Sequence, residues 1–283
     1  MKLVRYGEAG RERPGMIDAE GGVRSLVGVV DDISPETLAG GLVDRLRGLD
    51  PALLERVAPG ARLGPPLSRV GNFVAVGLNY AEHATETDAA IPAEPILFNK
   101  APSCVVGPND DVALPSGSAK TDWEVEIAFV VGRRASCVAE ADALAHVAGY
   151  TICNDISERA YQLERGGQWV KGKCFPTFGP LGPWLVTPDE IADPQTLGLW
   201  MEVNGERMQN SNTRTMIFPI RELVAYISRH MILEPGDVVT TGTPPGVGLG
   251  MKPERYLKVG DVMRLGVDGL GEQRQQVRAW AAA

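Results

Sequence analysis

The run from Asp122 to Gly132 constrains the fold of this chain more than any other segment, because acidic and apolar residues alternate at its start. Successive side chains of a β-strand point to opposite faces, so a strand here would gather the acids on one face. Those acids are Asp122, Glu124 and Glu126, and the opposite face would contain Trp123, Val125, Ile127, Phe129 and Val131. Glutamate is a poor strand former and neighbouring like charges repel, so the acidic row needs a stabilising partner. A bound divalent cation would be such a partner, and the alternative is an edge strand whose acids face water.

The composition indicates a globular chain and argues against two classes of partner. The chain has 283 residues, of which 44% are hydrophobic and 23% charged, so a sizeable core can form. Its net charge of −8, without a block of basic residues, argues against binding to nucleic acid or to anionic membranes. Acidic small molecules are not excluded, because a bound metal ion can invert the local field.

Three further features predict a cytoplasmic protein. No apolar run approaches the ~20 residues that a membrane-spanning helix needs. The first seven residues lack the apolar segment of a signal peptide. The cysteines show no C-x-x-C spacing and are most simply explained as reduced thiols: Cys104, Cys137, Cys153 and Cys174.

We expect two domains, a small α+β unit over residues 1–66 and a longer, strand-rich unit over residues 67–283. In the first unit, Lys2–Tyr6 and Gly15–Asp18 are predicted strands, and Ser34 is a predicted N-cap for a helix that begins at Pro35. The segment Pro59–Pro66 is dense in proline and glycine, which is typical of a linker.

The second unit shows strand and helix patterns in alternation. Predicted strands are Gly71–Gly77, Gly149–Asp155, Asp237–Thr241, a hairpin over Leu199–Gln209 that turns at Asn204-Gly205, and strands within Tyr256–Val277. Predicted helices are Asn79–Thr87, Ala139–Val147, Ser157–Arg165 and Pro219–Met231.

Asp155 ends an apolar strand, where functional carboxylates are common. Together with Glu124 and Glu126 it would give three oxygen ligands, a set that suits Mg²⁺ or Mn²⁺ better than zinc. The alternative for Asp155 is an N-cap for the helix that starts near Ser157.

Other candidate residues have the chemistry of an active site. His83 and Glu86 are three residues apart, so on a helix they share a face and can form a general base with an orienting carboxylate. Lys173 lies in an apolar stretch with many turn residues and could stabilise an oxyanion, or it could extend from a loop into solvent. The loop Thr241–Gly248 follows a strand and offers backbone N–H groups to a carboxylate.

Together these segments resemble the fumarylacetoacetate hydrolase family over essentially the whole chain. The matching pieces are Gly77–His83, Asp122–Glu126, Asn154–Ser157, Gly172-Lys173, Val203–Gly205, Gln209–Thr213 and Thr241–Gly248. The resemblance implies a strand-rich α+β fold with a mixed β-roll in the C-terminal domain, a small variable N-terminal domain, and a homodimer.

The resemblance also implies a metal site. The family's ligands for a divalent ion, Mg²⁺ or Mn²⁺, fall on Glu124, Glu126 and Asp155. Asp122 has no ligand role in this pattern, and we expect it behind the ligands or facing solvent.

The family's catalytic and substrate-binding positions are matched as well. The water-activating pair falls on His83 and Glu86, within a segment that acts as a mobile lid in relatives, and the active-site lysine falls on Lys173. Gln162 matches a glutamine that hydrogen-bonds substrate, and Thr243 matches a residue that holds the carboxylate end of the substrate.

The expected reaction is cleavage of the C3–C4 bond of a 2,4-dioxo acid, either an acylpyruvate or a 2,4-didehydro-3-deoxy sugar acid, to pyruvate and a carboxylic acid. Within the family, the N-terminal unit and Glu164–Trp169 resemble bacterial sugar-acid enzymes of the 2,4-didehydro-3-deoxy-L-rhamnonate hydrolase type. The same site could instead decarboxylate oxaloacetate, hydrate a 2-oxo-enoate or act as a ureidoglycolate lyase. A non-catalytic module that binds a metal or an acid is the remaining alternative.

Overall fold

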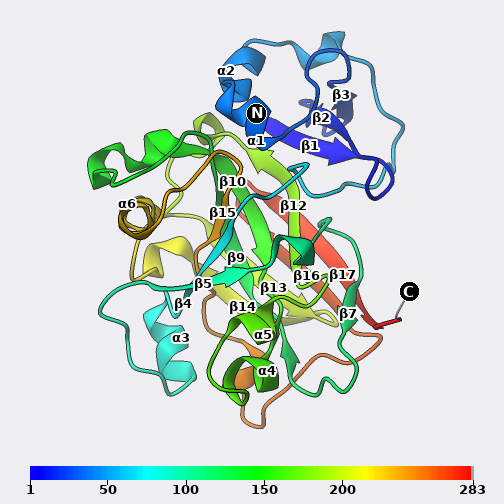
Figure 1. The fold of residues 1–283 in the computed structure, drawn as a ribbon. Coiled ribbons are helices and arrows are strands. Elements are labelled where there is room, and N and C mark those ends of the chain that lie inside the picture. The colour runs from blue at the N-terminus through cyan, green and yellow to red at the C-terminus, as the bar shows by residue number, and fades with distance from the viewer. Residues whose placement is uncertain (282–283) are drawn as a thin grey trace.

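A mixed ten-stranded sheet runs through the structure, a computed structural model that describes residues 1–281 (Figure 1). Its strand order is β3-β2-β1-β12-β10-β9-β15-β4-β5, and β6 pairs with β12 beside this path. The strands are β1 (Lys2–Tyr6), β2 (Arg13–Ile17), β3 (Val23–Ser25), β4 (Phe73–Gly77), β5 (Ile96–Lys100), β6 (Val105–Val106), β9 (Val125–Val131), β10 (Val147–Asn154), β12 (Gly179–Val186) and β15 (Val238–Thr240).

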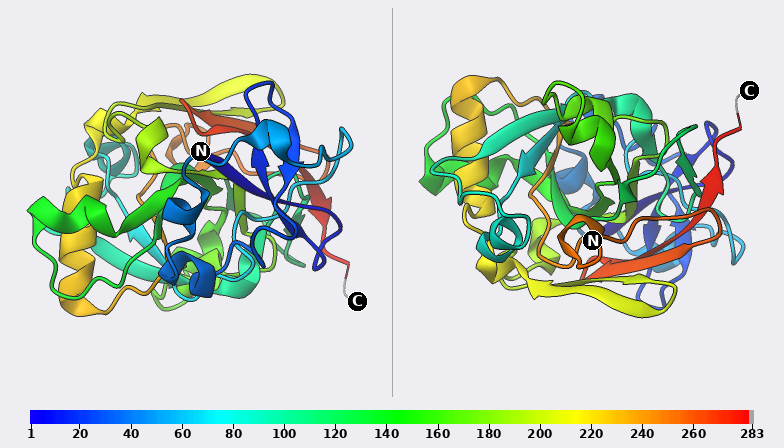
Figure 2. Two further views of the ribbon diagram at one scale, coloured as in Figure 1. Left: turned by 90° about the horizontal axis from the view of Figure 1, so that it is seen from above. Right: turned by 90° about the horizontal axis from the view of Figure 1, so that it is seen from below.

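A five-stranded sheet packs against the centre of the large one, and Figure 2 shows it along one side of the molecule. Its order is β14-β13-β16-β17-β7, from β7 (Val112–Leu114), β13 (Gly198–Val203), β14 (Glu206–Asn212), β16 (Val262–Val267) and β17 (Gly271–Ala279). A separate pair joins β8 (Thr121–Asp122) to β11 (Ser157–Glu158). The predicted turn at Asn204-Gly205 lies between β13 and β14 of this second sheet, and the chain also turns at Asp268-Gly269, between β16 and β17.

Helices are short and lie around the sheets. They are α1 (Pro35–Ala39), α2 (Leu42–Leu46), α3 (Ala81–Glu86), α4 (Arg159–Leu163), α5 (Val170–Lys173) and α6 (Ile220–His230). The structure also contains short 3₁₀ helices at Pro51–Leu53, Pro102–Cys104, Glu140–His146, Pro188–Glu190, Thr213–Thr215 and Gly248–Gly250. None of the helices in residues 1–281 has the length and apolar character needed to cross a bilayer.

Both sheets contribute to one hydrophobic core. Phe129 and Ile152 from the large sheet, and Met201 and Leu265 from the smaller one, are fully buried members of the same cluster. This strand-rich α+β architecture with mixed sheets confirms the predicted fold class.

The first 66 residues connect directly to the large sheet, because β1 pairs with β12 in antiparallel register. The predicted start of α1 is confirmed: the Ser34 side chain accepts from Thr37 N, and Pro35 is the first helical residue. Figure 1 places β1–β3, α1 and α2 at one end of the molecule and α3, α4 and α5 toward the other. The domain boundary at residue 66 stays a prediction.

Two predicted helices differ from the structure. The segment Glu140–His146 forms a 3₁₀ helix in place of an α-helix. The helix expected from Ser157 begins only at Arg159, because Ser157 and Glu158 pair with β8 and the Glu158 side chain accepts from Ala160 N.

Candidate active site and metal centre

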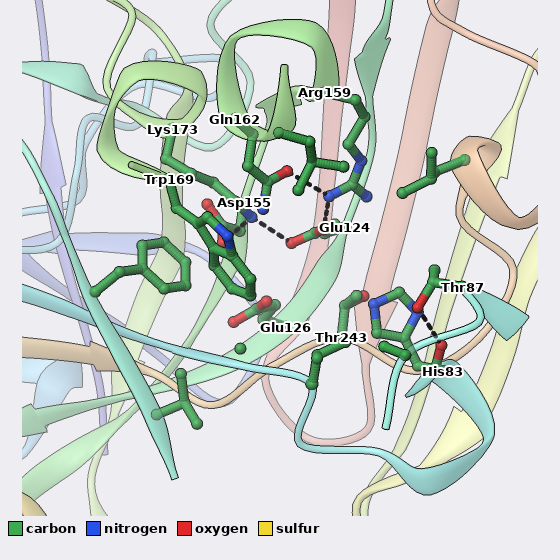
Figure 3. A pocket seen from close by; sticks show the side chains of 17 residues that line it. His83, Thr87, Glu124, Glu126, Asp155, Arg159, Gln162, Trp169, Lys173 and Thr243 are labelled. Atoms are coloured by element: carbon green, nitrogen blue, oxygen red, sulfur yellow. Dashed lines mark hydrogen bonds and ion pairs between the residues drawn. The ribbon is translucent and has the colours of Figure 1, made fainter. Parts of the chain in front are cut away.

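The three acids predicted to bind a metal ion converge at the ends of two neighbouring strands. Strands β9 and β10 are antiparallel, with Glu126 opposite Cys153, and the N–H of Asp155 donates to the carbonyl of Glu124 at 2.9 Å. One carboxylate oxygen from each of Glu124, Glu126 and Asp155 lies within 4.8 Å of the others. The carboxylates point toward a common space, as Figure 3 shows.

The alternation predicted that the acidic row lies on one continuous strand, and this prediction is wrong. The chain leaves the extended ladder at Trp123 and Glu124, between β8 and β9. The interpretation as an edge strand with acids facing water is also wrong, because β9 lies between β10 and β15 and Glu124 and Glu126 are 4% and 1% exposed.

Asp122 lies behind the metal-binding candidates and is fully buried, so the part of the expectation that allowed it to face solvent is wrong. Its Oδ1 accepts from Gly248 N at 2.7 Å, and its Oδ2 accepts from Leu249 N at 3.0 Å. Arg159 Nε donates to the same Oδ2 at 2.9 Å. Asp122 therefore fixes both the loop after β15 and the guanidinium group of Arg159.

The three candidate ligands have different electrostatic surroundings. Burial alone would raise the pKa of Glu124, but the charges of Lys173 and Arg159 outweigh it and lower this pKa to about 2. Within residues 1–281, Glu126 forms no direct ion pair, and the charge of Lys173 lowers its pKa only in part; its Oε2 accepts from Gly242 N at 2.9 Å. Burial raises the pKa of Glu126 well above its usual range, and the carboxylates of Asp155 and Glu124 raise it further.

This arrangement fits a divalent cation. Glu126 is a buried carboxylate that faces two others, and bringing like charges together in a buried site is costly unless a cation lies between them. An all-oxygen donor set is the type that Mg²⁺ and Mn²⁺ prefer. Glu124, Glu126 and Asp155 are thus the residues that would hold the ion.

Asp155 does not cap a helix, and the alternative interpretation of this residue is wrong. Its Oδ2 accepts from Lys173 Nζ at 2.7 Å, and its Oδ1 forms an ion pair with Lys100 Nζ at 2.6 Å. Lys173 is only 2% exposed and also donates to Glu124 Oε2 at 2.7 Å, so it does not extend into solvent.

Sequence reasoning missed two buried cations of this site, Lys100 and Arg159. Lys100, at the end of β5, is 1% exposed and donates to the carbonyl oxygen of Lys173 at 2.6 Å. Arg159, the first residue of α4, is 4% exposed and contacts Glu124 Oε1 at 2.7 Å. Arg159 and Gln162 are three apart on α4, and this spacing is the one sequence signal that could have placed them on a common face.

His83 and Glu86 share a face of α3 as predicted, with 3.4 Å between Nδ1 and Oε2. Glu86 Oε1 also accepts from Gly246 N at 2.8 Å. The glutamate therefore orients the imidazole and holds α3 against the loop after β15. Figure 3 shows His83 across the cavity from Asp155 and Lys173.

The loop Thr241–Gly248 offers backbone N–H groups to carboxylates, but these carboxylates belong to the protein. Gly242 donates to Glu126, Gly246 to Glu86 and Gly248 to Asp122. Gly242 has φ +93°, a conformation that side chains other than glycine rarely adopt. One loop thus positions a candidate metal ligand, the partner of His83 and the partner of Arg159.

A cavity of about 140 Å³ brings the candidate residues together. It is lined by the three acids and by His83, Lys173, Gln162 and Thr243, whereas Glu86 lies behind His83. The close packing of α5 on α4 depends on Gly172, where a Cβ would lie 2.6 Å from Gln162 Cβ. This packing places Lys173 and Gln162 on one wall.

Gln162 and Thr243 already have partners inside the protein. Gln162 Oε1 accepts from Arg159 Nη1 at 3.1 Å, which leaves its NH₂ group for a ligand. Thr243 Oγ1 donates to the carbonyl of Val125 at 3.0 Å and accepts from Gln209 Nε2 at 2.8 Å. The Thr243 hydroxyl proton is therefore not directed into the cavity.

Comparison with known proteins agrees with this geometry. Residues 72–278 match the family described as Fumarylacetoacetate (FAA) hydrolase C-terminal. The chain belongs to the fumarylacetoacetate hydrolase family. A protein of Burkholderia multivorans named as a hydrolase is 55% identical over 280 residues, which is 99% of each chain. The expectation of an enzyme of this family is therefore confirmed.

Solved structures of the family superpose closely on this chain. A fumarylacetoacetate hydrolase from Exiguobacterium antarcticum has a TM-score of 0.89 at 36% identity and covers 99% of this chain and 100% of its own. A maleylpyruvate hydrolase from a Sphingobium species, in complex with manganese(II) and pyruvate, has a TM-score of 0.82 at 27% identity with the same coverage. A 5-carboxymethyl-2-hydroxymuconate delta-isomerase from Mycobacterium smegmatis has a TM-score of 0.77 at 31% identity and covers 100% of both chains.

Proposed function

We propose that the protein is a metal-dependent hydrolase that cleaves the C3–C4 bond of a 2,4-dioxo acid to give pyruvate and a carboxylic acid. The observation that supports this most directly is the buried cluster of Glu124, Glu126 and Asp155, which shares one cavity with His83. A hard cation held there and a base on the opposite wall are the two parts that hydrolysis of an acylpyruvate requires.

The proposed cofactor is Mg²⁺ or Mn²⁺, held by the three acids. When bound, the ion would attract the oxygens of a 2-oxo acid and would stabilise the negative charge that develops on them as the C–C bond breaks. The manganese and pyruvate in the related maleylpyruvate hydrolase support this assignment.

His83 acts as the general base in the proposed reaction. Its Nδ1 faces Glu86, so Nε2 is the nitrogen available to take a proton from the water that attacks C4. The Glu86 carboxylate stabilises the imidazolium that results, and its second contact with Gly246 N keeps it in place.

Lys173 and Gln162 stabilise the oxyanion that forms at C4. Two of the three Lys173 N–H groups donate to Glu124 and Asp155, and the third is free for a substrate oxygen. The Gln162 NH₂ group is free as well, since its oxygen is bound by Arg159. Donors fixed in this way stabilise developing charge without reorganising.

A panel of substrates tests the proposal. Pyruvate release from acetylpyruvate should require Mg²⁺ or Mn²⁺, stop with EDTA and resume when the metal is restored. Oxaloacetate, a 2-oxo-enoate and ureidoglycolate serve as the comparison substrates for decarboxylase, hydratase and lyase activity. Faster turnover of one of these compounds than of acetylpyruvate would replace the hydrolase proposal with the corresponding activity. No turnover of any compound would favour a non-catalytic binding module.

We also propose a cytoplasmic homodimer. The four cysteines are free thiols, which fits a reducing compartment. The mass in solution, measured by light scattering, tests the dimer: a value near 30.3 kDa would show a monomer.

A further inference from the structure

The cavity changes character from its floor to its mouth. The charged residues of the floor, Glu124, Glu126, Asp155, Arg159 and Lys173, are all at most 4% exposed. The residues nearer solvent are apolar and partly exposed: Leu78, Phe98, Leu163, Trp169 and Leu249. A ligand whose charged head lies on the floor would therefore direct its other end along an apolar wall.

Trp169 and Phe98 form the main part of that wall. Their ring centroids are 5.3 Å apart in an edge-to-face arrangement, and the ammonium of Lys173 lies 5.1 Å from the centroid of Phe98. Gly77 makes room for the indole, because a Cβ at Gly77 would lie 2.3 Å from Trp169 Cζ3. The wall thus begins directly beside the proposed oxyanion-stabilising lysine (Figure 3).

The cations that line the cavity are bound to neighbouring side chains, apart from the one Lys173 N–H assigned above to the oxyanion at C4. Arg159 binds Asp122, Glu124 and Gln162, and Lys173 binds Glu124 and Asp155. At the apolar end, the Thr87 hydroxyl donates to the carbonyl of His83. A second carboxylate or a row of hydroxyl groups on the ligand would lose more hydrogen bonds to water there than the single indole N–H of Trp169 can replace, which is unfavourable.

We infer that the enzyme selects 2,4-dioxo acids whose acyl tail is an uncharged alkyl or aryl group, and that Trp169 is the main specificity-determining residue. This inference rests on the proposed function and specifies the substrate of the same site. It differs from the sugar-acid expectation, because the side chains of this wall offer a polyhydroxylated tail one donor, the Trp169 indole N–H, and are otherwise apolar.

A series of acylpyruvates measures the preference. Going from acetylpyruvate to butanoylpyruvate and hexanoylpyruvate, kcat/KM should rise by about fourfold per buried methylene group. Maleylpyruvate and a 2,4-didehydro-3-deoxy sugar acid should be cleaved more slowly than butanoylpyruvate. Faster cleavage of either of these two would overturn the inference, and absence of pyruvate from every compound would instead refute the proposed function.

Binding separates the two proposals because it does not require cleavage. The two ligands are 2-oxohexanoate and 2-oxoadipate, which differ only at C6: the first has a methyl group there and the second a carboxylate. Both are measured with Mg²⁺ present. Calorimetry should give at least tenfold tighter binding of 2-oxohexanoate, whether or not any acylpyruvate is hydrolysed. Equal or tighter binding of 2-oxoadipate would contradict the apolar wall.

Variants of Trp169 assign the preference to this residue. Trp169→Ala should lower kcat/KM for hexanoylpyruvate by about tenfold or more and change acetylpyruvate much less. Trp169→Arg should reverse the order of 2-oxohexanoate and 2-oxoadipate. The matched control is Trp200→Ala, because Trp200 lies on β13 and stacks with Arg207 of β14, outside the cavity. If Trp169→Ala and Trp200→Ala keep the wild-type preference alike, Trp169 does not determine it.

Discussion

Lys100 Nζ lies 2.6 Å from Asp155 Oδ1, and both side chains are at most 1% exposed. The second oxygen of the same carboxylate is bound by Lys173, so two ammonium groups hold Asp155 in one orientation. Burial alone would lower the pKa of Lys100, but the negative charge of Asp155 outweighs this effect and raises it. Lys100 thus remains charged and holds Asp155, a candidate metal ligand, in one orientation.

Replacement of Lys100 by methionine should destabilise the protein strongly. The variant leaves the Lys173 carbonyl without its donor and removes one of the two charges that compensate Asp155. Breaking a buried ion pair from one side typically costs about 3–5 kcal/mol. Denaturant unfolding measures the loss, with Lys120→Met as the control, because Lys120 pairs with Glu164 at the surface. A similar small effect in both variants would show that Lys100 is not essential to the site.

Replacement of Glu126 by glutamine should abolish metal binding and keep the fold. The amide removes one of three adjacent buried carboxylates, so the metal-free variant should unfold with a free energy equal to or above that of the wild type. Saturating Mg²⁺, at about 100 times its dissociation constant, should stabilise the wild type by about 2.7 kcal/mol and the variant by much less. Activity should fall on the order of 10³-fold, since a metal ion contributes several kcal/mol to charge stabilisation. Full turnover with normal metal affinity would refute the ligand assignment.

Replacement of His83 by alanine should lower kcat by ~10²–10⁴-fold, the usual contribution of a general base. Glu86→Gln should lower kcat less, because the amide oxygen can still accept from Nδ1 but the charge that stabilises the imidazolium is lost. Metal affinity, followed by calorimetry, should stay the same in both variants. Glu82→Gln is the matched control, since Glu82 is an exposed residue of the same helix. Normal kcat in His83→Ala would exclude its role as base.

Local signals in the sequence were sufficient for many elements of the fold. The Ser34-Pro35 cap, the Asn204-Gly205 turn and the apolar strand before Asp155 follow from short-range chemistry, and the structure contains all of them. The face shared by His83 and Glu86 follows in the same way from their spacing on α3. These features depend on residues at most a few positions apart.

The rest of the site depends on contacts across the sheet, which no local pattern reveals. Lys100 is bound to the site through residues 55 and 73 positions away, and its strand gives no indication that this lysine points inward. The alternation at Asp122–Glu126 grouped Asp122 with Glu124 and Glu126 on one strand, but the chain departs from the strand between them, and Asp155 is the third acid of the cluster. The grouping of Asp155 with Glu124 and Glu126 rested on their shared ligand chemistry and on the family resemblance, because periodicity describes one strand and not its neighbours.

The pair of Asp122 and Arg159 provides the last prediction. Asp122 accepts from Arg159 Nε and from the N–H groups of Gly248 and Leu249, so every contact of its carboxylate is with a donor. In Asp122→Asn the NH₂ group must face one of these donors, and Arg159 loses a compensating charge in a fully buried position. We expect the free energy of unfolding to fall by about 3–5 kcal/mol.

Asp111→Asn is the matched control, because Asp111 forms an Asp–Arg pair with Arg278 that is about half exposed. A solvent-exposed pair contributes little to stability, so this variant should unfold like the wild type. Asp122→Asn should also lower kcat/KM, since the loop after β15 that Asp122 holds provides the N–H group bound by Glu126. If Asp122→Asn instead unfolds and turns over like Asp111→Asn, the contacts of Asp122 do not position the site, and the ion pairs of Glu124 with Lys173 and Arg159 hold it without Asp122.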